Sequence, residues 1–195
     1  MTIEKGRPWG ADAVRPADLR IVASDSELAD AVASGLVESI GVSGGDLHRS
    51  LGSPPDREAM QRLPIDVLEV TADDMTFLAV AHVVARRGWW RGRIVAVCNV
   101  ERVGDWEVAP RAHPNDGRFD VVEIDESMTI RERWQARQRL PAALHVPHRK
   151  IATQTARRRT WEFDRPHAIW VDGRHVVDAA SLQVVVRPDA FELLV

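Results

Sequence analysis

The chain has 195 residues, of which 45% are hydrophobic and 28% charged, a composition typical of a soluble globular protein with one sizeable core or two small ones. The formal net charge of -3 gives no general attraction to nucleic acid or anionic lipid, so any such contact requires a local patch. Cys98 is the only cysteine, which excludes an internal disulfide and fits a reducing cytoplasm. The longest apolar run, residues 77–85, is too short to span a bilayer, and the N-terminus has no apolar signal segment.

The first third of the chain predicts a small α/β unit. Residues 19–23 form a short strand, and a helix with a capping pattern follows and ends at Gly35. Residues 36–42 form a buried strand that runs into Gly44-Gly45-Asp46 and a second helix start. This arrangement suits a phosphate, because unpaired amides and the helix dipole both favour an anion.

The middle of the chain predicts mainly strands. A short helix over residues 56–61, ended by Leu63-Pro64, precedes an alternating strand over 65–70. Residues 75–84 are rich in branched residues and favour a strand, although their length also permits a helix. Residues 93–100 form another strand.

Residues 108–124 begin as an irregular loop and end as a strand. Pro110 and Pro114 remove backbone donors and hold the preceding residues extended. A tight turn follows, and it brings the carboxylates of Asp116 and Asp120 near backbone carbonyls, which suits a hard cation. The alternative is an ordinary turn with solvated acids.

The C-terminal third predicts one helix and several strands. Residues 125–138 form a helix, capped at Asp125-Glu126-Ser127, on which Ile130 and Trp134 share a narrow apolar face. Its arginines can meet anionic headgroups, but a solvated charged face is the favoured interpretation. The short strands that follow indicate a β-sandwich. They are expected at residues 151–156, 160–163, 168–171, 175–177, 182–186 and 191–195.

Two motifs carry a family resemblance. Ala109-Pro110, Ala112, Asn115-Asp116-Gly117 and Asp120 resemble the Pro-x-Ala-x-x-x-Asp-Gly-x-x-Asp signature of the bacterial diacylglycerol kinase and sphingosine kinase family of lipid kinases. Downstream, Ala156-Arg157-Arg158 and Val171-Asp172-Gly173 are similar to the closing run of that family. The resemblance implies an α+β, β-rich fold, in which residues 63–195 form a lipid-kinase-type β-sandwich domain and residues 1–62 form a reduced α/β nucleotide lobe.

The nucleotide lobe departs from the family pattern. Gly44, Gly45 and Asp46 match the start of the Gly-Gly-Asp-Gly-Thr nucleotide loop, and the resemblance assigns them to ATP binding, with Asp46 also catalytic. Leu47 and His48 then replace the small residue and the hydroxyl. The segment before the loop is short, and no Gly-Thr-x-Asn-Asp segment follows it. We therefore expect ATP binding to be impaired or absent.

The resemblance also assigns a metal site and a base. A structural Mg²⁺ is expected at the Asp116 carboxylate and the backbone carbonyls of His113 and Arg118. The family's general base follows Asp172-Gly173, where this sequence has Arg174. Arginine stays protonated and cannot accept the proton of a lipid hydroxyl. Asp172 or His175 is the alternative base, although each is more simply a turn residue or a strand-face residue. Arg174 is instead expected to hold a phosphate or to pair with Asp46.

Two classes of function remain open. The first is a cytoplasmic, magnesium-dependent diacylglycerol kinase-like transferase that phosphorylates a lipid hydroxyl with ATP, with its activity impaired. The second is a non-enzymatic β-sandwich module that binds a lipid, an anionic ligand or a partner chain. In either class we expect no nucleic acid partner and at most peripheral membrane contact, and a homodimer is one way to supply the missing lobe.

Overall fold

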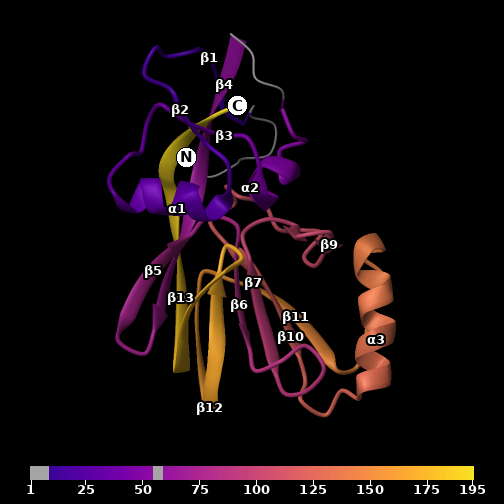
Figure 1. The fold of residues 1–195 in the computed structure, drawn as a ribbon. Helices are drawn as coiled ribbons and strands as arrows, with labels where there is room; N and C mark the ends of the chain where they lie inside the picture. Colours follow the sequence, from indigo (N-terminus) through magenta and orange to yellow (C-terminus); the bar gives the residue numbers. More distant parts are fainter. Residues whose placement is uncertain (1–8, 55–58) are drawn as a thin grey trace.

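The computed structural model describes residues 9–54 and 59–195, and one large, mostly antiparallel sheet dominates it (Figure 1). The sheet order is β1-β4-β13-β12-β6-β7-β10-β11, with β5 paired to β4 and with β3 and β2 added in parallel beside β13. The strands are β1 (Ala11–Val14), β2 (Arg20–Val22), β3 (Ile40–Val42), β4 (Ala59–Ala72), β5 (Met75–Ala79), β6 (His82–Arg86), β7 (Ile94–Cys98), β8 (Arg102–Val103), β9 (Trp106–Glu107), β10 (Phe119–Ile124), β11 (Ile151–Ala156), β12 (Arg158–Val171) and β13 (Arg174–Leu194). The helices are α1 (Asp25–Ala33), α2 (Gly45–Ser50), α3 (Ile130–Arg139) and a 3-10 turn, Leu140–Ala142.

The β-sandwich core lies between strands of the lower half in Figure 1. Alternate residues of these strands point inward and are almost fully buried, as expected for a sheet with one face in the core. They include Leu68, Val70, Val83, Val95, Val97, Phe119, Trp161, Ile169, Leu182 and Val184. The β-rich fold expected from the sequence is confirmed.

A second core lies in the upper part of Figure 1, where α1, α2 and β3 pack on the ends of β4 and β13. Leu28 of α1 and Leu47 of α2 are fully buried there, together with Ile65 of β4 and Leu193 of β13. β4 and β13 therefore serve both cores. The expected domain boundary at residues 62 and 63 falls inside β4, and the division into two domains stays a prediction.

A third, smaller core lies beneath α3. It contains Val84, Ile94, Ala96, Val122 and Ile151 from the sheet, and Ala136 and Leu140 pack against it. Among the described residues, every helix is too short or too polar to span a lipid bilayer.

The expected helix over residues 56–61 is wrong where the structure describes it, because Ala59–Gln61 already belong to β4. Residues 56–58 lie outside the described part of the chain. Met60 and Leu63 are buried, and β4 pairs with β1 on one side and with β13 on the other. Tertiary pairing thus outweighs the local helix preference, and Pro64 is accommodated within the strand.

The expected strand over residues 75–84 is two strands, β5 and β6, and the helix alternative is wrong. The chain leaves the sheet at Val80 and Ala81, whose amides donate to the Asp172 carboxylate instead of a neighbouring strand.

The six short C-terminal strands are three longer ones, β11, β12 and β13. The gaps expected between residues 163 and 168 and between residues 186 and 191 contain Pro166 and Pro188. At both places the pairing register shifts and the chain bulges, but it remains in the sheet. The helix α3 starts five residues later than expected, because Thr129 rather than Asp125 forms its capping box with Glu132.

Candidate functional site

The glycine turn between β3 and α2 has the shape expected from the sequence. Gly45 adopts φ +94°, and a Cβ at this position would lie 2.4 Å from Oδ1 of Asp25. A Cβ at Gly44 would lie 2.5 Å from the carbonyl oxygen of Ala23. Both positions therefore require glycine because a neighbouring group packs directly against the turn.

The group beside Gly45 is a side-chain carboxylate from the same chain. Asp25, the first residue of α1, accepts hydrogen bonds from the amides of Asp46 at 2.5 Å and Leu47 at 3.1 Å. Burial raises the pKa of Asp25 to about 6, and the negative charge of Asp172 adds to the shift. The amides at the start of α2, expected to face a phosphate, donate to Asp25 instead.

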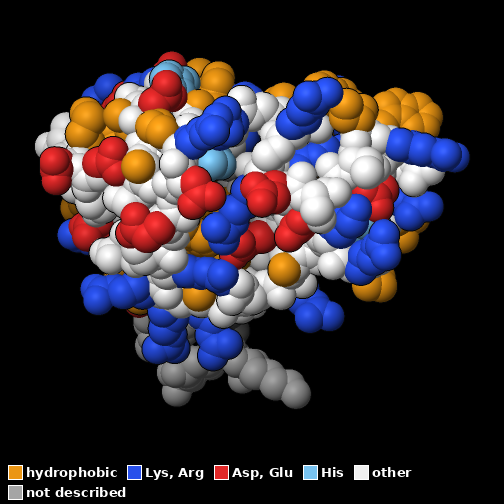
Figure 2. Space-filling model, turned by 90° about the horizontal axis from the view of Figure 1, so that it is seen from below, with side chains coloured by type: hydrophobic (Ala, Val, Ile, Leu, Met, Phe, Trp, Pro, Cys, Tyr) orange, Lys and Arg blue, Asp and Glu red, His pale blue; other side chains and the backbone are white. Residues whose placement is uncertain are grey.

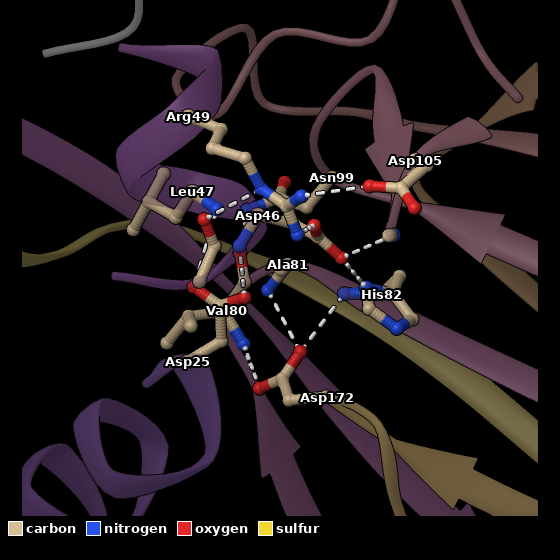
Figure 3. A network of polar contacts seen from close by, with 12 residues as sticks. Asp25, Asp46, Leu47, Arg49, Val80, Ala81, His82, Asn99, Asp105 and Asp172 are labelled. Atoms are coloured by element: carbon tan, nitrogen blue, oxygen red, sulfur yellow. Dashed lines mark hydrogen bonds and ion pairs between the residues drawn. The ribbon is translucent and has the colours of Figure 1, made fainter. Parts of the chain in front are cut away.

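Asp46 points away from the glycine turn and is nearly fully buried (Figure 3). Its Oδ1 lies 2.6 Å from Nη2 of Arg49, and its Oδ2 accepts from the amide of Gly104 at 2.9 Å. Nδ1 of His82 lies 3.4 Å from the same Oδ2. The structure thus brings Gly44, Gly45 and Asp46 together, with the Asp46 carboxylate engaged by one cation and one amide.

A third carboxylate, Asp172, completes this network. It accepts from the amides of Val80 at 2.9 Å, Ala81 at 3.0 Å and His82 at 2.9 Å. Burial raises its pKa to about 6, and Asp46 adds to the shift while the three amides oppose it. The sequence suggested only a hairpin turn here, although the family resemblance had marked the position.

His82 lies between two of these acids. Burial lowers its pKa, because the charged imidazolium loses hydration, while Asp46 and Asp25 favour the charged form. We call the set Asp25, Asp46, Arg49, His82 and Asp172 the polar junction, since it joins α1, α2 and the sheet. The carboxyl groups of Asp25 and Asp172 have raised pKa values and take up protons more readily than free aspartate. They also occupy backbone amides that would otherwise be available to an anion.

Arg174 does not make the expected pair with Asp46, and its expected contact with a phosphate stays a prediction. Its guanidinium makes a two-pronged ion pair with Asp30 of α1, at 2.9 Å and 2.7 Å, rather than with Asp46. The pKa of Asp30 is lowered by this hydrogen-bonded arginine, and both side chains are largely exposed. Arg174 therefore closes the outer side of α1 onto the hairpin between β12 and β13.

The loop proposed for magnesium is irregular before Phe119, as the prolines indicated. Asp116 accepts from the amide of Arg118 at 2.9 Å, and its own amide lies 3.4 Å from the carbonyl of His113. Burial raises the pKa of Asp116, and Asp120 adds to the shift. No group of three or more His, Cys, Asp or Glu side chains is arranged for a metal within residues 9–54 and 59–195. The family's magnesium needs only one side chain here, so the expected set of His113, Asp116 and Arg118 stays a prediction.

A buried acid that the sequence did not reveal holds this loop. Asp66 of β4 accepts from the amide of Gly117 at 2.7 Å, from the side chain of Asn115 at 3.2 Å and from the amide of Asp189 at 2.9 Å. In an alternating strand Asp66 reads as an exposed residue, and only the tertiary partners show why it faces inward.

A separate apolar cavity of about 90 Å³ lies between α3 and the sheet. Its lining is almost entirely hydrophobic and includes three tryptophans. The lining residues are Val84, Trp89, Trp90, Ile94, Ala96, Val103, Trp106, Val108, Val122, Ile124, Arg133, Ala136, Arg137, Leu140, His145 and Ile151. No sequence pattern singled out this site, because its walls come from separated segments between residues 84 and 151.

The fold is a β-sandwich of the lipid-kinase C-terminal type, with a short α/β segment on the ends of β4 and β13. The chain belongs to the family defined by the YegS C-terminal NAD kinase beta sandwich-like domain, whose model matches residues 66–195. The family expected from the sequence motifs is thereby confirmed.

Solved structures show the same fold. A candidate diacylglycerol kinase from Bacillus anthracis strain Sterne superimposes with a TM-score of 0.65 at 14% identity, covering 90% of this chain and 77% of that one. A second such structure gives a TM-score of 0.66 at 13% identity with the same coverage. A diacylglycerol kinase from the same organism gives 0.55 at 14% identity, covering 79% of this chain and 65% of that one. No curated protein matches the sequence significantly.

Proposed function

We propose that this chain is a lipid-kinase-family domain that binds an apolar, acyl-bearing ligand and does not transfer phosphate to it from ATP. The observation that carries the proposal is the Asp25 carboxylate, which takes the amides of Asp46 and Leu47. A phosphate at the glycine turn needs these donors. It would also meet the carboxylates of Asp25 and Asp46 at close range.

The position of the expected base supports the same conclusion. Arg174 cannot accept a proton, and its guanidinium is held by Asp30. Asp172 is the nearest carboxylate in sequence, but it is buried and accepts three backbone amides. The exposed acceptors of this hairpin, His175 and Asp178, are hydrogen-bonded to each other at 2.9 Å and do not occupy the position directly after Gly173, where the base is expected.

The apolar cavity beneath α3 is the site we assign to the ligand. Cavities lined by aliphatic and aromatic side chains stay dry and accept small apolar groups, as engineered cavities of about 150 Å³ accept benzene. A volume of about 90 Å³ suits a few methylene groups. A longer chain enters only if α3 moves outward.

Magnesium has a structural role in this proposal. The charge of Asp116 raises the pKa of Asp66, and the charge of Asp120 raises the pKa of Asp116, so a divalent cation at Asp116 would offset this repulsion. We expect Mg²⁺ to raise the melting temperature of the wild-type protein by a few degrees, which corresponds to a stabilisation of about 1 kcal/mol. This stabilisation should be lost in Asp116→Ala. Equal melting temperatures with and without Mg²⁺ in both proteins would contradict this role.

Two titrations test the function. Calorimetry with Mg-ATP should show no binding at millimolar nucleotide, and incubation with Mg-ATP and diacylglycerol should yield no phosphorylated lipid. A dansyl-labelled fatty acid should bind, and Ala136→Phe, which fills the cavity from α3, should weaken its binding about 10-fold. Gln138→Phe is the matched control, because Gln138 is exposed on the same helix and does not line the cavity.

Tight binding of ATP, or phosphate transfer to the lipid, would overturn the proposal in favour of a working kinase. Equal fatty-acid affinity in the Ala136→Phe and Gln138→Phe variants would show that the ligand does not occupy the cavity beneath α3.

A further inference from the structure

One end of the molecule exposes an unusual combination of tryptophan and arginine. It is formed by the β6–β7 loop and the outer side of α3, at the right-hand end of Figure 2, where blue and orange side chains gather. Trp134 is 54% exposed, Ile130 49%, Trp89 40% and Trp90 39%. We call this surface the Trp-Arg face; it comprises Arg87, Trp89, Trp90, Arg91, Ile130, Arg131, Trp134 and Arg137.

The two elements of the face are fixed to each other by one buried arginine. Arg133 of α3 is only 4% exposed and donates to the carbonyls of Met128 at 3.0 Å, Trp89 at 3.2 Å and Asp125 at 3.1 Å, and also to that of Gly92. These contacts tie the β6–β7 loop to the first turns of α3. The tryptophans are thus presented from a fixed position.

Ring contacts make the face continuous. The guanidinium of Arg137, three residues after Trp134, lies 5.7 Å from the ring centre of Trp90, and that of Arg86 lies 4.3 Å from the ring centre of Trp89. Both distances are within the range of cation–π attraction. The rings of Trp89 and Trp90 are therefore held by arginines, and Trp89 also packs edge-on against Trp106 of β9.

The charge of the face differs from that of the whole chain. Residues 86–93 and 130–139 hold eight arginines and one acid, Glu132, whereas the chain has a net charge of -3. Glu132 is engaged by Thr129 and by Lys150, which holds its pKa low, at about 2. Five of the arginines are exposed and pair with no carboxylate in the described part of the chain: Arg87, Arg91, Arg131, Arg137 and Arg139. Asp125 and Glu126 mark the edge of the positive region.

We propose that the Trp-Arg face docks on an anionic phospholipid bilayer surface, with Trp134 and Ile130 inserted at the level of the headgroups. Tryptophan prefers this interface because its ring is apolar and its N–H is polar. Exposed arginines bind lipid phosphates with paired hydrogen bonds and gain from the negative surface potential.

The apolar component favours a bilayer over a nucleic acid. Ile130 and Trp134 lie one turn apart on α3, so they form an apolar stripe parallel to the helix axis. A helix lying in a membrane interface has such a stripe flanked by basic residues. The sugar-phosphate backbone of a nucleic acid would offer Ile130 no apolar contact.

Docking would place the cavity beneath α3 against the lipid, because Trp89, Trp90 and Arg137 both border the cavity and belong to the Trp-Arg face. In this respect the inference rests on the proposed function, since the cavity is where an acyl chain from the bilayer would go. The exposure and the charge of the Trp-Arg face do not depend on the cavity.

Vesicle flotation tests the inference with the full chain. Vesicles of phosphatidylcholine containing roughly one third phosphatidylglycerol should bind the protein at about 0.15 M salt, and vesicles of phosphatidylcholine alone should not. The double variants Ile130→Ser/Trp134→Ser and Arg91→Gln/Arg131→Gln should each reduce partitioning about 10-fold or more. None of these four side chains lines the cavity. The matched control, Val14→Ser/Arg20→Gln, changes an exposed apolar residue and an exposed arginine at the opposite end of the molecule (Figure 1).

Equal partitioning of the three double variants would overturn the docking surface. Tighter binding to oligo-dT than to the anionic vesicles would also overturn it. So would a concentration-dependent dimer that is lost in Ile130→Ser/Trp134→Ser. Binding of soluble dansyl fatty acid separates the two proposals. If vesicle binding fails while fatty-acid binding persists, the docking inference falls and the proposed function stands. If only vesicle binding persists, the reverse holds.

Discussion

The polar junction and the α3 region place buried charge in opposite ways. In the junction, the carboxylates of Asp25 and Asp172 accept five backbone amides between them, and Asp46 is held by Arg49 and Gly104. In the α3 region, a single buried cation, Arg133, donates to carbonyls and leaves an apolar cavity beside it. A glycine turn alone therefore does not make an anion site. An internal acid can use the same donors, and an open site can then lie elsewhere in the fold.

The largest effect is expected from removing an acid of the junction. Asp172→Ala leaves the amides of Val80, Ala81 and His82 buried without an acceptor, which should reduce the free energy of unfolding by about 4 kcal/mol. Urea denaturation measures this loss. The control is Asp178→Ala, which removes an exposed acid from the same hairpin and should change stability by less than about 0.5 kcal/mol. Similar losses in the two variants would contradict the role assigned to Asp172.

The contribution of the polar junction to stability should depend on pH. The pKa values of Asp25 and Asp172 are raised to about 6, so between about pH 4 and 6 the folded state binds more protons than the unfolded chain. Their contribution to stability therefore falls as pH rises through this window. The pKa of His82 is lowered from its ordinary value of 6.5. Below that pH the unfolded chain binds more protons at this residue than the folded state, so the contribution of His82 to stability rises with pH.

The difference in stability between wild type and one variant measures the effect of the Asp172 carboxyl group, including its effect on the pKa of Asp25. Asp172→Asn removes one raised pKa and leaves His82 in place, so the free-energy gap between wild type and variant should shrink by up to about 3 kcal/mol from pH 4 to pH 7. Urea midpoints at several pH values give this gap. A constant gap would show that Asp172 is ionised throughout the range.

The α3 region should respond locally. Arg133→Met removes the donors to Met128, Trp89, Gly92 and Asp125, and should reduce stability by about 2 kcal/mol. Hydrogen exchange should increase mainly in residues 88–92 and in α3, while the junction stays protected. Arg139→Met is the control, because Arg139 is exposed on the same helix. Uniform loss of protection over the whole chain would contradict a local role.

A pair of glycines separates crowding from backbone strain. Gly45 and Gly52 have φ values of +94° and +81°, but only at Gly45 would a Cβ meet Asp25; at Gly52 nothing described lies within 4 Å. Gly52→Ala should cost about 1 kcal/mol from the left-handed backbone alone, and Gly45→Ala about 1–2 kcal/mol more. Equal losses would show that Asp25 does not press against the turn.

Local signals in the sequence predicted several elements correctly. The capping pattern at Ser24 places α1, and Gly44-Gly45 places the turn before α2. The two prolines and Asn115-Asp116-Gly117 place the irregular loop before β10. These features depend on residues a few positions apart, which a sequence shows directly.

The partners that decide the site are far apart in the chain. Asp25 reads as an acid in the first turn of a helix, and only the folded chain shows that it accepts from amides 21 and 22 residues later. Asp172 reads as a turn residue, but its amide donors lie 90 to 92 residues earlier. The cavity beneath α3 is assembled from separated segments between residues 84 and 151, so no local pattern can indicate it.

The central claim is that the amides of the glycine turn are occupied by Asp25, and amide NMR tests it most directly. Spectra of the ¹⁵N-labelled protein should show the Asp46 and Leu47 amide resonances unchanged as Mg-ATP is added to millimolar concentration. Their hydrogen exchange should be slow already without nucleotide. Saturable shifts of these two resonances at micromolar Mg-ATP would contradict the account, because the donors would then be available to a phosphate.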